Sequence, residues 1–332
     1  MNTLNRKVLS IFVLLFLLIL LGCVNNKKKK STESSVTEET QAISKPFFKL
    51  SLAEWSIHNM IMDKTFNPID FADKAKEMGF EGLEYVSQLY KPLYKDSADS
   101  KAALQEVLDS LKMKSEANGL KNVGIMVDNE GDLASPDEKE RLQGVGNHKK
   151  WIDAAAFLGC YYVRVNLFGS EDPTVWVQQS VKSLTDLAIY AKTKGIDVIV
   201  ENHGYLSSNA PLLVEVMKGV NMHNCGVLPD FGNFCLKREG GEQGGAKCIE
   251  EYDRYGGVQQ MMPYAKAVSA KSYDFDKDGN ETIIDYGKMM QIVKDGGYKG
   301  YVGVEYEGTR LSEEDGINAT KKLLLKVANE LK

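Results

Sequence analysis

Histidine is scarce in this chain, with 4 among 332 residues, and the 5 cysteines include no Cys-x-x-Cys pair. This composition argues against a cysteine zinc site and against a centre that holds several zinc ions. Positive charge is also limited, because 41 Lys and Arg face 46 Asp and Glu and give a net charge of −5. Phosphate binding needs clustered Lys and Arg, so we expect no nucleic-acid partner.

A long apolar run occurs at the N-terminus. Arg6 and Lys7 precede an almost wholly apolar stretch, residues 8–21, which is followed by Gly22 and Cys23. Residues 8–21 are fewer than a membrane-spanning helix needs, so this apolar stretch is typical of a signal peptide. Its end resembles the lipobox of bacterial lipoproteins, in which the cysteine is lipidated.

We therefore expect residues 1–23 to be a lipoprotein signal peptide with Cys23 as its lipidation site. Residues 24–45 are polar and without apolar periodicity, which predicts a flexible linker. The mature protein is expected outside the cytoplasm, in the periplasm or at the cell surface, and anchored to the membrane by its lipid. An uncleaved N-terminal anchor is the alternative and leads to the same location.

Export permits disulfide bonds. Cys235 and Cys248 bracket the glycine-rich stretch LKREGGEQGGAK and could staple it. Cys160 and Cys225 stand at the starts of apolar strands, which indicates buried thiols.

A recurring unit organises residues 46–332. An amphipathic helix ends at a glycine, a short apolar strand follows, and the strand ends in polar residues, as in 71–86, 151–169, 187–204 and 289–308. Eight candidate strands at a spacing of roughly 30–40 residues predict an α/β fold, a (β/α)8 TIM barrel. They lie near 48–55, 82–85, 123–128, 162–166, 197–201, 226–230, 267–271 and 301–305. A doubly wound open sheet is the rival, but LAEWSIHNM after the first strand lacks the glycine-rich phosphate fingerprint.

Carboxylates stand where three of these strands end: Glu201, Asp230 and Glu305. Strand ends and the loops after them form the active face of such a barrel, so we expect the three to meet. Packed together, they require a shared proton or a cation, and Mg²⁺ or Mn²⁺ suits carboxylate oxygens. Alternatively, each carboxylate caps the next helix or pairs with a neighbouring Lys or Arg.

Six stretches carry a family resemblance: GFEGLEY (79–85), RVN (164–166), VENHGYLSS (200–208), LPDFGNF (228–234), AVSAKSYDFD (267–276) and GYVGVEYEG (300–308). In this order they resemble the xylose isomerase-like TIM barrels of the sugar phosphate isomerase/epimerase superfamily. The resemblance implies a divalent metal, Mn²⁺ or Mg²⁺, held by Glu201, Asp230 and Glu305. The family's seventh-strand histidine ligand is replaced by Ser269. Either His203 takes its place, or Lys271 supplies the positive charge and there is no metal.

The resemblance also implies a reaction. Glu201 and Glu305 would act as an acid/base pair that removes and returns a proton beside a carbonyl, as a sugar isomerase or epimerase does. Export and the lack of a basic cluster favour an unphosphorylated sugar or glycoside. A lyase or hydrolase of 3-keto-glycosides is the alternative enzyme, and a non-catalytic sugar-binding lipoprotein is the third reading.

Further side chains near strand ends are candidates for substrate binding. Trp55 could stack against the face of a sugar ring or be part of the core. Arg164 could bind sugar hydroxyls or neutralise Asp128 or Glu130. An EF-hand-like stretch, DFDKDGNETIID (274–285), is better explained as an acidic turn than as a calcium site. The substrate-binding candidates are Trp55, His58, Glu84, Asn166, His203, Asn233 and Lys271.

Overall fold

The central sheet of the computed structural model, which describes residues 45–241 and 246–331, contains eight parallel strands. Their order is β6-β5-β4-β3-β2-β1-β10-β9. The bridges Val227–Ala265 and Asp230–Ser269 join the two outer strands and close the barrel. The strands are β1 (Lys49–Ala53), β2 (Gly82–Val86), β3 (Lys121–Val127), β4 (Tyr162–Val165), β5 (Asp197–Glu201), β6 (Cys225–Leu228), β9 (Val268–Ser272) and β10 (Tyr301–Tyr306). The predicted (β/α)8 barrel is confirmed.

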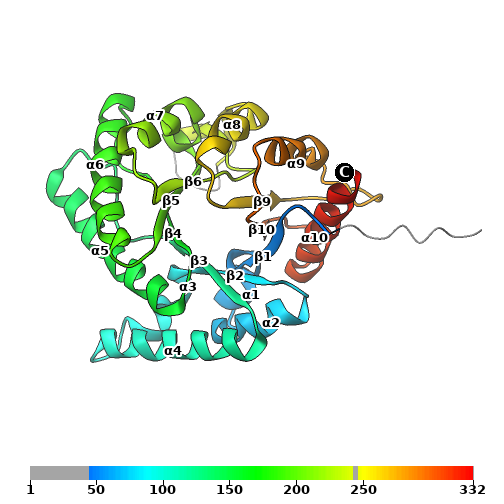
Figure 1. The fold of residues 1–332 in the computed structure, drawn as a ribbon, viewed down its shortest axis with the longest axis horizontal. Coiled ribbons are helices and arrows are strands. Elements are labelled where there is room, and N and C mark those ends of the chain that lie inside the picture. The colour runs from blue at the N-terminus through cyan, green and yellow to red at the C-terminus, as the bar shows by residue number, and fades with distance from the viewer. Residues whose placement is uncertain (1–44, 242–245, 332) are drawn as a thin grey trace, which may run out of the picture. The chain divides into compact units, whose positions relative to one another are not determined.

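Helices surround these strands (Figure 1). They are α1 (His58–Met62), α2 (Phe71–Glu77), α3 (Ser87–Tyr94), α4 (Ser100–Asn118), α5 (Glu138–Leu158), α6 (Pro173–Lys192), α7 (Ala210–Val220), α8 (Arg254–Met261), α9 (Tyr286–Asp295) and α10 (Glu313–Glu330). Asp172 caps α6 by accepting from two backbone N–H groups, and Ser312 caps α10. The glycines predicted at the helix ends, Gly79, Gly159 and Gly195, adopt positive φ angles of 71–74°.

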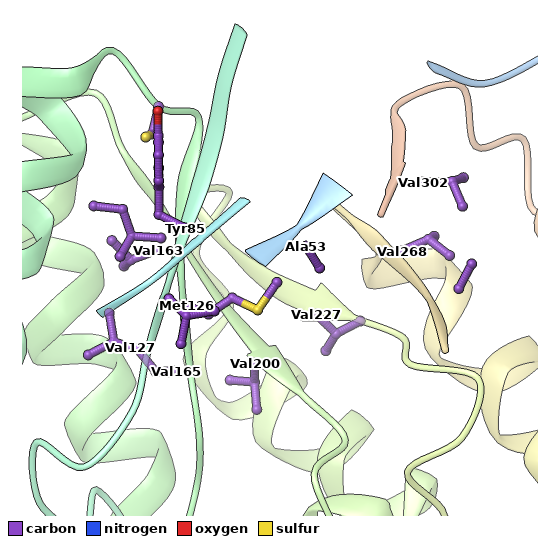
Figure 2. Packing of buried hydrophobic residues seen from close by; sticks show 14 of the residues in the cluster. Ala53, Tyr85, Met126, Val127, Val163, Val165, Val200, Val227, Val268 and Val302 are labelled. Atoms are coloured by element: carbon purple, nitrogen blue, oxygen red, sulfur yellow. The ribbon is translucent and has the colours of Figure 1, made fainter. Parts of the chain in front are cut away.

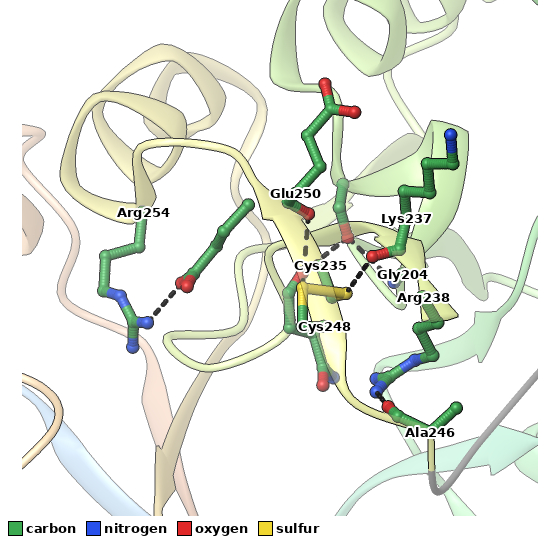
Figure 3. The surroundings of a disulfide bond; sticks show 11 residues. Gly204, Cys235, Lys237, Arg238, Ala246, Cys248, Glu250 and Arg254 are labelled. Carbon is green, nitrogen blue, oxygen red and sulfur yellow. Dashed lines mark hydrogen bonds and ion pairs between the residues drawn. A yellow bond between two sulfur atoms is a disulfide. The ribbon is translucent and has the colours of Figure 1, made fainter. Parts of the chain in front are cut away.

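An antiparallel hairpin, β7 (Cys235–Arg238) with β8 (Cys248–Glu251), is inserted between β6 and α8. A disulfide joins Cys235 to Cys248, the pairing that the sequence left open, with their Cα atoms 5.8 Å apart (Figure 3). The other two cysteines of the barrel are free thiols. Cys160 is buried as expected, whereas Cys225 is only partly buried, because it opens β6 at the rim.

The strands separate two apolar layers. Alternate side chains pack outward against the helices, as Val198 and Val200 do on β5, and Figure 2 shows Val200 among the side chains of this outer layer. Ile199, between them in the chain, belongs to the inward cluster. The inward layer is a small separate cluster made of Val123, Tyr162, Ile199, Leu228, Ala267 and Tyr301. It fills the barrel below the strand ends, so the next inward positions along the chain, such as Glu201, open a polar layer above it.

The predicted signal peptide, the linker up to residue 44 and Cys23 lie outside the described residues. Within the part that is described, no helix combines the length and the apolar character needed to cross a bilayer.

Candidate active site

Three carboxylates converge in the polar layer of the barrel. Glu201 ends β5, Asp230 follows β6, and Glu305 lies near the end of β10. One oxygen from each lies within 4.8 Å of the others, and the residues are 1 %, 0 % and 4 % exposed. Residues 29 or more positions apart in the chain are therefore brought to one point.

Both oxygens of Glu201 have partners. The amide of Asn233 donates to Oε1 at 2.9 Å, and Arg164 Nε forms an ion pair with Oε2 at 2.9 Å. Burial raises the pKa of Glu201 to about 7, against the opposing effect of Arg164. The carboxyl group therefore exchanges protons near neutral pH.

Asp230 and Glu305 share the hydroxyl of Ser269. Ser269 Oγ lies 2.5 Å from Asp230 Oδ2 and 2.9 Å from Glu305 Oε2, while the backbone N–H groups of Gly232 and Asn233 donate to Asp230 Oδ1, each at 2.8 Å. A hydroxyl carries a single hydrogen, so it cannot donate to both carboxylates at once. Burial raises the pKa of Asp230 to about 7, which fits a proton or a cation between the two groups.

Lys271 stands on the other side of Glu305. Its ammonium nitrogen lies 2.9 Å from Glu305 Oε1 and 3.2 Å from Glu307 Oε2, and the residue is 1 % exposed. Burial disfavours the charged amine, but the carboxylates around it outweigh burial and raise the pKa of Lys271 well above its usual value. Trp55 donates from Nε1 to Glu307 Oε1 at 2.5 Å, so Glu307 joins the tryptophan to the lysine.

Arg164 has a second partner, Asp128. The guanidinium donates from NH1 to Asp128 Oδ1 at 2.7 Å, and the Asn166 amide donates to the same oxygen at 2.7 Å. Burial opposes ionisation, but Arg164 holds the pKa of Asp128 below its usual value. Arg164 thus neutralises Asp128, as one reading of the sequence expected, and also contacts Glu201. It makes no contact with Glu130 among the described ion pairs, since Glu130 pairs with Lys150.

A cavity of about 510 Å³ borders the carboxylate cluster: Glu305 lines it, whereas Glu201 and Asp230 lie behind its surface. Of the residues proposed from the sequence, it is lined by Trp55, Asn166, His203, Asn233 and Glu305. His203 lies in the wall, with its ring edge-on to Phe168 at 6.0 Å, and is not a member of the three-carboxylate cluster. Burial lowers the pKa of His203, which favours the neutral imidazole.

The other proposed residues lie away from the cavity surface. His58 stacks on Trp55 with ring centroids 4.3 Å apart and hydrogen-bonds the Trp55 carbonyl, and Lys271 lies behind Glu305. Glu84 is buried inside the barrel, where the Ser51 hydroxyl donates to it, and burial raises its pKa to about 7. A Cβ on Gly303 would lie 2.5 Å from Glu84 Oε1, so this glycine leaves room for the carboxylate.

Several lining residues were not proposed from the sequence: Glu130, Asp132, His148, Arg238 and Glu307. Glu307 lies two residues after Glu305 on the same strand side, and this spacing was a usable signal. Arg238 comes from the β7–β8 hairpin. This hairpin is not part of the repeating helix–strand unit, so the repeat did not predict that it would line the cavity. The EF-hand-like stretch is an acidic turn, in which Asp276 accepts from the backbone N–H groups of Asp278 and Asn280.

The cluster offers only oxygen donors, from three carboxylates and the Ser269 hydroxyl. Such a set fits a hard divalent ion and not a soft one. Glu201, Asp230 and Glu305 could hold it, although Arg164 and Lys271 already contact two of these groups.

Comparison with known proteins gives the family. The family described as "Xylose isomerase-like TIM barrel" matches residues 72–327. Two similar solved structures are the IOLI protein with a bound zinc atom (18% identical, TM-score 0.62, 86% of this chain and 99% of that chain) and D-psicose 3-epimerase from Clostridium cellulolyticum H10 (18%, 0.59, 86% and 96%).

A curated relative, the C-glycoside deglycosidase alpha subunit of Arthrobacter globiformis, is 40% identical over 65 residues. The match spans 19% of this chain and 18% of that relative. Because the family match covers most of the barrel, the chain belongs to the xylose isomerase-like TIM barrel family.

Proposed function

We propose that this protein is an enzyme that moves a proton at the carbon beside the carbonyl of an unphosphorylated sugar, as a sugar isomerase or epimerase does. The observation that carries the proposal is the convergence of Glu201, Asp230 and Glu305 beside a cavity that Glu305 lines and that is large enough for a sugar. The similarity of this fold to that of D-psicose 3-epimerase supports the reaction class.

Glu201 and Glu305 form the acid/base pair of the proposal. An acid or base works best when its pKa lies near the working pH, and burial raises the pKa of Glu201 to about 7. Glu305 faces the cavity, and Lys271 at 2.9 Å balances its charge. Asn233 and Arg164 orient the Glu201 carboxyl through hydrogen bond and ion pair.

A divalent metal, Mn²⁺ or Mg²⁺, belongs to the proposal as cofactor. Glu201, Asp230 and Glu305 would hold it, and His203 in the cavity wall is a further candidate ligand. When bound, such an ion polarises carbonyl and hydroxyl oxygens of the substrate. The similar IOLI structure contains a bound zinc atom.

The electrostatics of the cavity favour a sugar without phosphate. Its lining includes Asp128, Glu130, Asp132, Glu305 and Glu307. The two arginines that line it, Arg164 and Arg238, and the two lysines that pair with these acids, Lys150 and Lys271, are fewer than the five acids, and Arg164 also pairs with Glu201. A phosphate dianion would be repelled, whereas hydroxyl groups can donate to the carboxylates. Trp55, Asn166 and Asn233 in the wall, with His58, Glu84 and Lys271 behind it, complete the proposed substrate-binding set.

The test is incorporation of solvent deuterium into a panel of free aldoses and ketoses, with and without Mn²⁺. We expect exchange at the carbon beside the carbonyl, and loss of at least 100-fold in rate in Glu201→Gln and in Glu305→Gln, because general acid–base catalysis contributes about 10²–10⁴-fold. Glu77→Gln on the exposed side of α2 is the control. Unchanged exchange in both glutamine variants refutes the assignment. Tight sugar binding without any exchange in the wild type identifies a sugar-binding protein instead.

The alternative enzyme is a lyase or hydrolase of 3-keto-glycosides. The 65-residue match to a C-glycoside deglycosidase subunit supports it, and the reaction starts with the same proton removal. Release of the aglycone from a 3-keto-glycoside, with no isomerised free sugar, selects this alternative.

We also propose that the barrel is a lipoprotein held at a membrane outside the cytoplasm by a lipid on Cys23, with residues 1–23 removed up to this cysteine and residues 24–45 as a tether. Cys23→Ser should move the protein from the membrane fraction or block its processing. Equal fractionation of the variant and wild type contradicts the anchor.

A further inference from the structure

We propose that the site takes a two-ring substrate, a glycoside whose sugar ring carries a keto group, and that a second cavity beside the first binds its aglycone. This inference rests on the proposed function, because it adds a subsite to the same sugar site. It concerns residues that have no part in the three-carboxylate cluster.

The second cavity has a volume of about 500 Å³, close to that of the first. The two cavities share three wall residues, Phe168, Tyr205 and Arg238. The two cavities are therefore adjacent and separated by these three residues, and the proposed ligand spans this boundary. Together they are at the upper end of the roughly 300–1,000 Å³ that small-molecule sites occupy.

The linings of the two cavities differ in chemistry. The first is rich in carboxylates, whereas the second is lined by the apolar side chains of Leu167, Phe168, Trp176, Leu206 and Leu236. Charged groups such as Glu171 and Glu250 are exposed members of its lining. Hydroxyl-rich sugar rings suit the first lining, and an aromatic or apolar ring suits the second. This difference identifies an aglycone rather than a second identical sugar as the preferred occupant.

The wall between the cavities is held by local structure on both sides. Tyr205 has a positive φ of 54°, an unfavourable conformation for a non-glycine residue. The turn is held by Ser207 and Ser208, whose hydroxyls accept from the backbone N–H groups of His203 and Gly204. A tyrosine kept in such a conformation at a cavity boundary is typical of ligand-binding sites.

The β7–β8 hairpin forms the opposite side. Its disulfide joins β7 to β8 (Figure 3). Leu236 and Arg238 on β7 line the second cavity. Arg238 donates from NH1 to the Ala246 carbonyl at 2.7 Å, which holds the guanidinium at the boundary. The guanidinium carries five N–H donors in all, so it can also hydrogen-bond oxygens of a ring on either side. A wall fixed in advance lowers the entropy lost on binding.

The experiment compares binding of 4-nitrophenyl and methyl glycosides of glucose, galactose and xylose to the full-length protein by calorimetry. We expect the 4-nitrophenyl glycoside of the preferred sugar to bind about 10-fold tighter or more than its methyl glycoside, since burying an aromatic ring contributes at least this much. Leu236→Trp fills the second cavity and should bring the ratio of the two affinities toward one. Leu236→Ala, which removes contact area, should lower it less.

The matched control is Ile249→Trp on the neighbouring strand β8. Ile249 is 54 % exposed and lines neither cavity, so the affinity ratio should keep its wild-type value. Equal affinities for the two glycosides in the wild type overturn the second subsite and leave the proposed function standing. Binding of 4-nitrophenol alone as tightly as the glycoside also overturns it. If neither glycoside nor free sugar binds, the proposed function falls, and this inference falls with it.

Discussion

Glu54 is a buried carboxyl group outside the proposed site, and its substitution by glutamine gives a sharp prediction. The residue opens the turn after β1 and is fully buried. The Tyr90 hydroxyl lies 2.5 Å from its Oε1, and the backbone N–H of Val86 donates to Oε2 at 2.8 Å. Burial outweighs these hydrogen bonds and raises the pKa of Glu54 from 4.5 to about 8.

The sign of the effect on stability follows from the proton. Below pH 4.5 the carboxyl is protonated in both the folded and the unfolded chain, so its stabilising contribution is fully present. As the pH rises toward 8, the unfolded chain has released the proton and the folded protein still holds it, so this contribution is lost. At 1.36 kcal/mol per pH unit, the loss is about 4 kcal/mol between roughly pH 5 and pH 9.

Glu54→Gln removes this titration and keeps both hydrogen-bond partners, because an amide oxygen can accept from Val86 and an amide N–H can donate to Tyr90. We expect the free energy of unfolding of the variant, minus that of the wild type, to rise by about 4 kcal/mol from pH 5 to pH 9. The other buried acids are present in both proteins, so their contributions cancel in this difference.

Urea unfolding at several pH values, followed by circular dichroism, measures this difference. Glu77→Gln, on a side chain that is 72 % exposed, is the control and should give a flat difference. Parallel stability curves for Glu54→Gln and the wild type would refute the reasoning, because they would show that burial does not keep the Glu54 proton in the folded state.

Two further predictions concern the interior of the barrel. Gly303→Ala should lower the free energy of unfolding by about 1–3 kcal/mol, since its Cβ would lie 2.5 Å from the buried Glu84 carboxyl. The control, Gly146→Ala, has nothing within 4 Å of its Cβ and should be neutral or stabilising. Urea unfolding compares the two variants, and equal effects would contradict the close approach. Mn²⁺ at about 100 times its dissociation constant should stabilise the wild type by about 2.7 kcal/mol in thermal unfolding, and Glu201→Gln should lose most of this gain while Glu77→Gln keeps it. Equal gains in the wild type and Glu201→Gln would place the ion elsewhere.

The barrel itself was predictable because its signals are local. Each unit repeats a helix stop and an apolar strand, and Gly79, Gly159 and Gly195 take the positive φ angles that such stops require. Alternation along a strand then assigns the inward side, so Ile199 and Glu201 had to share it. The meeting of Glu201, Asp230 and Glu305 follows once the strands are parallel and the barrel closes.

The partners of these carboxylates could not be predicted in the same way. That Arg164 contacts both Asp128 and Glu201 depends on rotamers and on the distance between neighbouring strands. The fate of His58 shows the same limit. Its place after β1 suggested a position in the cavity, but the turn carries its ring behind Trp55. The β7–β8 hairpin has no equivalent in the repeating unit, so its contribution of Arg238 to the wall had no sequence signal beyond the two bracketing cysteines.

Ser269 and Lys271 explain how three buried carboxylates coexist in this barrel. Three unpaired carboxylates so close together would repel strongly in a buried site. Here Arg164 lies 2.9 Å from Glu201 and Lys271 lies 2.9 Å from Glu305, so two of the three carboxylates contact a fixed cation, which each shares with a second acid, Asp128 or Glu307. Ser269 places a hydroxyl between the remaining carboxylate, Asp230, and Glu305. A divalent ion that binds here meets carboxylate oxygens whose charge is already partly neutralised. It must share these oxygens with the buried side chains of Arg164 and Lys271. The ion therefore gains less from this cluster than it would from three carboxylates without cationic neighbours, and the chain's own lysine and arginine supply part of the positive charge.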